Sequence, residues 1–131
     1  MVETKDLEMN QAIRTARSQL DDFLKLAAKP ENGTSGYKLK VMVRDGEATE
    51  HFWVDPFRVV GEGFEGTLAN APRTVRNVKH GQLLSFTRDD ISDWGYMRNG
   101  RQVGSFTVCV LFQRMPAEQA AYYRKNHGFD C

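Results

Sequence analysis

A stretch rich in basic residues and free of acidic ones is the first part of the sequence that could do chemistry. No aspartate or glutamate occurs between Glu65 and Arg88, whereas Arg73, Arg76 and Lys79 follow one another at three-residue steps. Guanidinium and ammonium groups bind phosphate and carboxylate groups, and loops of this length are usually functional. We therefore expect an anion-binding segment, although an ordinary solvated loop would have the same composition.

Both tryptophans stand in short segments that also hold a histidine or a tyrosine. Trp53 follows His51, and Trp94 precedes Tyr96. Such rings usually pack in a core, and a histidine on a strand usually has a structural role. The functional alternative is a ring platform at a pocket with a polar rim. The ligand-binding residues predicted from the two features are Arg73, Arg76, Lys79, Trp94, Tyr96 and His51.

Other residues that could support catalysis or metal binding lack the necessary spacing. Asp89, Asp90 and Asp93 could ligate a cation, but they lack the pattern of an EF-hand loop and are better explained as turn residues. The sequence has no Gly-x-Ser-x-Gly elbow, no P-loop and no Rossmann glycine pattern. We therefore predict no catalytic residue, no metal site and no cofactor.

A disulfide between the two cysteines is possible, but the sequence does not support one. Cys109 lies in an apolar run, where a thiol is usually buried and inert, and Cys131 is the last residue and expected to be mobile. No secretory signal or membrane-spanning stretch is visible, so we expect a cytoplasmic protein. The cytosol keeps thiols reduced, which argues against a disulfide.

Length and charge restrict the remaining possibilities. A chain of 131 residues predicts a single domain over residues 1–131. Its 18 basic and 17 acidic residues leave a formal net charge of +1, which gives no reason to expect a membrane or nucleic-acid partner. A protein partner or a small anionic ligand remains, and the oligomeric state stays open.

The elements that position these residues predict an α+β fold. An apolar stripe between Leu7 and Ala28 indicates an N-terminal helix. Alternating residues indicate strands over 37–43 and 48–54, joined by a type I′ turn at Asp45–Gly46 and ended by Pro56.

Further strands are expected over 63–68 and 82–87, followed by a hairpin over 91–104 that turns at Asn99–Gly100. Residues 106–115 fit a helix and a strand about equally well. A C-terminal helix follows Pro116 and closes at Gly128. The expected fold is an N-terminal helix, an antiparallel sheet of about five strands built from hairpins, and a C-terminal helix.

Three segments carry a resemblance to a known family. They are HFWVDPF (51–57), GFEGTLANAP (63–72) and DISDWGY (90–96), followed by Gly100 and Gly104. In this order and spacing they resemble the YegJ-like family, over about residues 9–124. The resemblance implies a small bacterial or phage-borne α+β domain with no established activity. A basic residue that is common in the family is replaced here by Cys109, which puts any role of that residue in doubt.

Three functions agree with these features. We favour a non-catalytic binding module for a protein partner or a small anionic ligand, for example an immunity or anti-defence factor. The alternative is a small enzyme acting on a phosphorylated or nucleotide-like substrate, with His51, Asp93 and Tyr96 around a cleft. The third is an oligomerisation domain with its aromatic clusters at a subunit interface.

Overall fold

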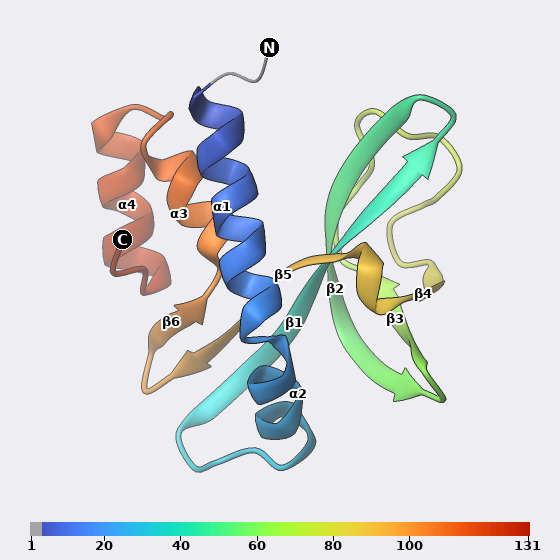
Figure 1. Ribbon diagram of the computed structural model, residues 1–131. Helices are drawn as coiled ribbons and strands as arrows, with labels where there is room; N and C mark the ends of the chain where they lie inside the picture. Colours follow the sequence, from blue (N-terminus) through green and yellow to red (C-terminus); the bar gives the residue numbers. More distant parts are fainter. Residues whose placement is uncertain (1–3) are drawn as a thin grey trace. The chain divides into compact units, whose positions relative to one another are not determined.

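The computed structural model describes residues 4–131. The chain forms two compact units, residues 37–92 and residues 1–36 together with 93–131. Strands β1 (Thr34–Asp45) and β5 (Ile91–Arg98) each begin in one unit and end in the other. Figure 1 labels the helices and strands and colours them along the sequence, from blue at the N-terminus to red at the C-terminus.

The unit of residues 37–92 is a four-stranded antiparallel meander. Strand order follows the chain, because β2 pairs with β1 and β3, and β3 pairs with β4. Beyond β1, its elements are β2 (Ala48–Val60), β3 (Gly63–Leu68), β4 (Leu83–Phe86) and the short 3-10 helix η1 (Arg88–Asp90). The strands predicted over 63–68 and 82–87 are therefore confirmed.

Two details of the first hairpin differ from the prediction. Asp45 faces Ala48 across the ladder, so the turn residues are Gly46 and Glu47, of which only Gly46 has a positive φ. A type I′ turn needs two positive φ angles, so the hairpin is confirmed and its turn type was wrong. Pro56 does not end β2 either, because the pairing with β3 shifts register between Val54 and Phe57 and leaves the proline outside the ladder.

The core of this unit combines strands with the loop that follows β3. Val75 and Val78, both in that loop, are buried together with Phe52 of β2 and Leu68 of β3. Two residues in an otherwise irregular segment thus take part in the hydrophobic core, and they fix the segment between them.

The other unit contains the α-helices that the structure describes, together with one hairpin. Its elements are α1 (Thr4–Ser18), α2 (Leu20–Ala28), part of β5, β6 (Arg101–Gly104), α3 (Phe106–Phe112) and α4 (Ala117–His127). The single N-terminal helix that was predicted is interrupted at Gln19, whose N–H bonds the Ala16 carbonyl in a tighter turn. The ambiguous segment 106–115 begins with helix α3.

The second hairpin and the last helix agree with the sequence prediction. Asn99 and Gly100 have φ angles of 50° and 82°, as a type I′ turn requires. Pro116 precedes α4, and Gly128 ends it with a φ of 78°. Residues 4–131 contain six strands, all in antiparallel pairings, with helices near both ends, so the α+β prediction is confirmed with one strand more than expected.

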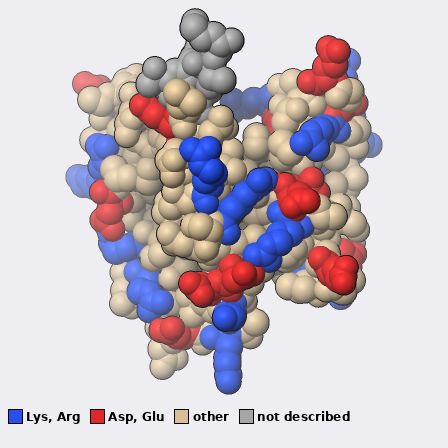
Figure 2. All heavy atoms as spheres, viewed as in Figure 1, with Lys and Arg blue, Asp and Glu red and all other residues tan. Residues whose placement is uncertain are grey.

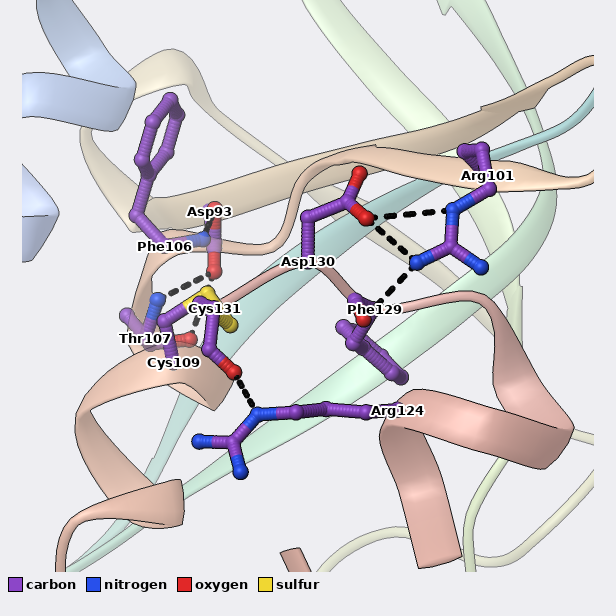
Figure 3. The surroundings of a disulfide bond; sticks show 9 residues. All are labelled: Asp93, Arg101, Phe106, Thr107, Cys109, Arg124, Phe129, Asp130 and Cys131. Atoms are coloured by element: carbon purple, nitrogen blue, oxygen red, sulfur yellow. Dashed lines mark hydrogen bonds and ion pairs between the residues drawn. A yellow bond between two sulfur atoms is a disulfide. The ribbon is translucent and has the colours of Figure 1, made fainter. Parts of the chain in front are cut away.

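The cysteine prediction was wrong, because Cys109 and Cys131 form a disulfide. Residues 128–131 are anchored: Gln102 N–H bonds the Gly128 carbonyl at 2.9 Å, and Phe129 packs edge-on against Phe112 with ring centroids 5.1 Å apart. Figure 3 shows Asp130 paired with Arg101 beside the bridge. These contacts hold Cys131 against α3, so it is not the mobile residue we expected.

None of the helices that the structure describes is long and apolar enough to cross a membrane. The expected cytoplasmic location remains a prediction, and the disulfide is a reason to test it, because such bridges are rare in the cytosol.

Candidate functional site

The basic loop, residues 69–82, continues along the edge of β2 that β3 leaves unpaired. Pairing between β2 and β3 starts at Val54 and Leu68 and runs away from the β1–β2 turn. Nearer the turn, the loop bonds this edge of β2 in place of β3. Ala69 N–H bonds the Trp53 carbonyl at 2.9 Å, and Trp53 N–H bonds Asn70 Oδ1 at 2.9 Å. The loop thus occupies the position of a further strand.

Glu50 fastens the middle of the loop. Its Oε1 accepts the backbone N–H groups of Arg73, Thr74 and Val75 at 3.1, 2.8 and 3.1 Å, and its Oε2 accepts Arg73 N–H at 2.9 Å. Desolvation by itself would raise the pKa of Glu50, but these hydrogen bonds and the charge of Arg73 lower the pKa overall. The carboxylate is therefore ionised near neutral pH and holds three consecutive amides in place.

Two further contacts hold the end of the same segment. Arg76 N–H bonds Asp45 Oδ2 at 2.9 Å, and Asn77 Nδ2 donates to the Arg44 carbonyl at 2.8 Å. The loop backbone is thus tied to the β1–β2 hairpin at several points.

The three cations of the loop alternate with its buried anchors. Val75 and Val78 are 3% and 7% exposed, whereas Arg73, Arg76 and Lys79 are exposed. None of these three side chains hydrogen-bonds or forms an ion pair with another residue that the structure describes. A fixed backbone therefore presents three cationic groups to solvent.

A groove of about 410 Å³ lies where the loop meets β2. It brings together two of the predicted residues, His51 and Arg73. The other lining residues are Glu50, Phe52, Asn70, Ala71 and Pro72. Because Asn70 Oδ1 accepts from the backbone, its amide nitrogen is a further donor beside the groove.

The surroundings of His51 favour its neutral form. Burial of the ring lowers its pKa, and the charge of Lys40 lowers it further. Its Nδ1 lies 2.9 Å from Ser92 Oγ, which also approaches the Lys40 carbonyl at 3.4 Å. Ser92 is only 2% exposed, so the pair orients the imidazole and does not present a nucleophile to solvent.

Trp94 and Tyr96 belong to the other unit and lie in its core. Their side chains are 5% and 8% exposed, and Phe23 stacks on Trp94 with ring centroids 4.9 Å apart. Both rings line a cavity of about 320 Å³ whose other lining residues include Asp22 and Glu31. The six predicted residues therefore belong to two different units, and Trp94 and Tyr96 are not part of the groove that Arg73 and His51 line.

Two of the three aspartates that could have bound a metal cap helices instead. Asp93, fully buried, accepts the N–H groups of Trp94 and Phe106 on Oδ1, and the N–H and hydroxyl of Thr107 on Oδ2. Figure 3 shows Asp93 beside Phe106 and Thr107. Asp90 Oδ2 accepts the N–H and hydroxyl of Thr87 at the start of η1. Within the described part of the chain, no group of three His, Cys, Asp or Glu residues could hold a metal ion.

Glu50 is the residue that the sequence reading missed. It lies on the same face of β2 as buried Phe52 and Val54, two and four positions further on. A charged residue at an inward-facing strand position was therefore a signal that it has a specific partner. Nothing in the sequence pattern indicated which backbone amides that partner would be.

Apart from the basic loop, acidic and basic side chains are intermixed on the surface that Figure 2 shows. This mixture agrees with the net charge of +1. Recognition of an anion must therefore come from a local arrangement such as the basic loop and not from a field of one sign.

Comparison with known proteins supports the resemblance read from the sequence. The chain is 34% identical over 112 residues to the uncharacterized protein YegJ of Escherichia coli K12, which covers 86% of this chain and 72% of YegJ. It is 35% identical over 86 residues to a Neisseria meningitidis serogroup B protein that carries the name of an ankyrin repeat protein (NMB1133/NMB1171). That match covers 66% of this chain and 34% of the longer protein.

No solved structure matches the chain significantly. A family model described as an uncharacterized protein conserved in bacteria (DUF2314) matches residues 6–131. Because the match covers nearly the whole chain, this protein belongs to that bacterial family.

Proposed function

We propose that this domain is a non-catalytic binding module that recognises an anionic group, on a small ligand or on an acidic protein surface, through the basic loop. One observation carries the proposal: Arg73, Arg76 and Lys79 project from a backbone that Glu50, Val75 and Val78 already fix. A preformed cationic surface loses less conformational entropy on binding than a flexible one does.

The groove beside the loop supports the same chemistry. An anion at Arg73 would have the side-chain amide of Asn70 in the same groove. Arginine can engage a carboxylate or a phosphate with two parallel hydrogen bonds. The groove would thus orient a ligand that the exposed cations attract.

The enzymatic alternative lacks its acid–base pair. It needs Asp93 and Tyr96 at a cleft with His51, yet Asp93 is fully buried and its carboxylate accepts four hydrogen bonds. The matched segment is also about a third of the longer Neisseria protein, which suits a module that works beside other domains. A role as an immunity or anti-defence factor is one setting for such a module.

The test reverses the charge of the loop. A triple variant, Arg73→Glu/Arg76→Glu/Lys79→Glu, is compared with Lys25→Glu/Lys29→Glu/Lys125→Glu, which changes the net charge equally at exposed positions outside the loop. The probes are a fluorescein-labelled decaglutamate peptide, followed by anisotropy, and pyrophosphate, followed by calorimetry.

We expect the loop variant to lose at least about tenfold in affinity for one probe, which corresponds to about 1.4 kcal/mol, while the control variant keeps most of its affinity. Equal losses in the two variants would show that only net charge matters and would remove the loop from the proposal.

A further inference from the structure

Strand β4 has one edge whose backbone groups are not used in the sheet. Of the strands that the structure describes, β3 alone pairs with β4. Leu68 N–H bonds the Gln82 carbonyl at 2.9 Å, and successive residues of a strand direct their backbone groups to opposite edges. The N–H and C=O groups of Leu83 and Ser85 therefore point away from β3. In the described part of the chain, no residue bonds these groups.

A groove of about 420 Å³ lies beside this edge. Its lining includes Leu84, Ser85 and Phe86 of β4 and residues 41–44 of β1. Val78, which also lines it, belongs to the core cluster on which Leu84 packs. The groove therefore combines an unpaired backbone edge with apolar residues of the core.

We propose that β4 and this groove bind an extended peptide segment of a partner protein as an added strand, with every second side chain of the peptide apolar. The edge and a peptide backbone are complementary in charge, because N–H groups are partly positive and C=O groups partly negative. Side chains alternate between the two faces of a strand, so every second side chain of the peptide would lie on the side of Leu84 and Phe86 and fill the groove.

A peptide fits this edge better than a second copy of the chain does. Two β4 strands could pair edge to edge, but Phe86 of each copy would already stack on Phe64 in its own unit, and Leu84 would pack on its own core. Such a dimer would bring no free side chain to the groove. The site uses backbone and apolar groups, so it does not depend on the function proposed for the cations of the basic loop.

Uncharged hexapeptides are the probe. Their ends are acetylated and amidated, and threonine alternates with valine, leucine or phenylalanine. Binding to the full ¹⁵N-labelled chain is followed by NMR at the backbone amides of Leu83 and Ser85. At least one peptide should bind saturably with a Kd below about 1 mM and slow hydrogen exchange at both amides. The absence of saturable binding by every peptide of the set would overturn the proposal.

Methylation of the peptide nitrogens tests whether a strand is added. Successive N–H groups of a strand point to opposite edges, so methyl groups on the threonine nitrogens and on the apolar-residue nitrogens block different edges. One methylated form should lose at least about tenfold in affinity, and the other should stay within about threefold of the parent peptide. Equal effects in the two forms would show that neither edge is used selectively and would overturn the proposal.

Variants at Ser85 test the protein side of the contact. Ser85→Pro removes an outward N–H that the ladder with β3 does not use, and it should weaken peptide binding about tenfold. Ser85→Ala keeps the N–H and should bind like the wild type. Unchanged affinity in Ser85→Pro would contradict the site, and the methylated peptides keep the test decisive if this variant does not fold.

Two further measurements separate this site from its alternatives. The variant Arg73→Glu/Arg76→Glu/Lys79→Glu should still bind the uncharged peptides, so the failure of one proposal would leave the other standing. Without peptide, exchange at the Ser85 amide should stay the same on dilution by about twentyfold. Protection that grows with protein concentration would identify a second copy as the occupant and would overturn the proposal.

Discussion

Each unit of this molecule contains a carboxylate that gathers backbone N–H groups from a distant segment. Asp93 accepts those of Phe106 and Thr107, and Glu50 accepts those of Arg73, Thr74 and Val75. The chemistry is the same, but Asp93 is fully buried and Glu50 is partly exposed.

Burial decides what each carboxylate contributes. Donors that lose Asp93 would be left in the core without a partner, which is costly. Donors that lose Glu50 could turn to water. We therefore expect Asp93 to determine whether its unit folds, and Glu50 to determine how one surface loop is shaped. The following experiments test this difference.

The largest effect is expected for Asp93→Ala. It leaves buried N–H groups unsatisfied and should lower the free energy of unfolding by about 4 kcal/mol, measured by urea denaturation. Asp22→Ala, at an exposed helix position, is the control. A loss of less than about 1 kcal/mol would show that water reaches these donors and that the comparison between the two carboxylates fails.

Loss of the disulfide should come next. The bridge joins residues separated by 22 positions, and closing a loop of this length stabilises the fold by about 3 kcal/mol, chiefly through the unfolded chain. Dithiothreitol should lower the urea midpoint of the wild-type protein and leave that of Cys109→Ser/Cys131→Ser unchanged. A wild-type midpoint insensitive to dithiothreitol would contradict the bridge.

Glu50→Gln should loosen the loop and leave the rest of the fold in place. Backbone amides of Arg73, Thr74 and Val75 should exchange faster with deuterium, and trypsin should cleave sooner after Arg73 and Arg76. Glu47→Gln, in the exposed turn before β2, should change neither. A large fall in the urea midpoint would instead place Glu50 beside Asp93 as a residue that determines folding.

The smallest effect concerns pH. Because the pKa of His51 is lowered in the folded protein, the unfolded chain takes up a proton first as the pH falls. Stability should therefore be unaffected by this residue above the ordinary histidine pKa and should decline below it until the lowered pKa is reached. The urea midpoint of wild type minus that of His51→Asn, followed from about pH 7 to pH 5, should fall over this window. A constant difference would contradict the assignment.

Local patterns in the sequence predicted most of the fold. Hairpins were found because glycine at Gly46 and Gly100 permits backbone angles that other residues rarely adopt. The bulge at Pro56 and the break at Gln19 were missed, since both depend on packing that a periodic pattern does not contain.

Contacts between distant residues could not be predicted in the same way. Asp93 was predicted to be a turn residue, a metal ligand or part of a catalytic cleft, and its role as a helix cap was missed because its partners lie 13 and 14 positions away. The cysteine pair was considered possible but unsupported because of an expected location, although residues such as Phe129 provide the packing that brings the sulfurs together.

The alternation of anchors and cations in the basic loop has a consequence for how the family can diverge. Val75 and Val78 maintain the path of the backbone, and the carboxylate of Glu50 bonds main-chain groups that every amino acid except proline supplies. Residues 73, 76 and 79 can therefore be exchanged with little cost to the core. Relatives that keep the anchors could evolve new partners by changing only these three positions, much as a fixed framework carries variable recognition residues.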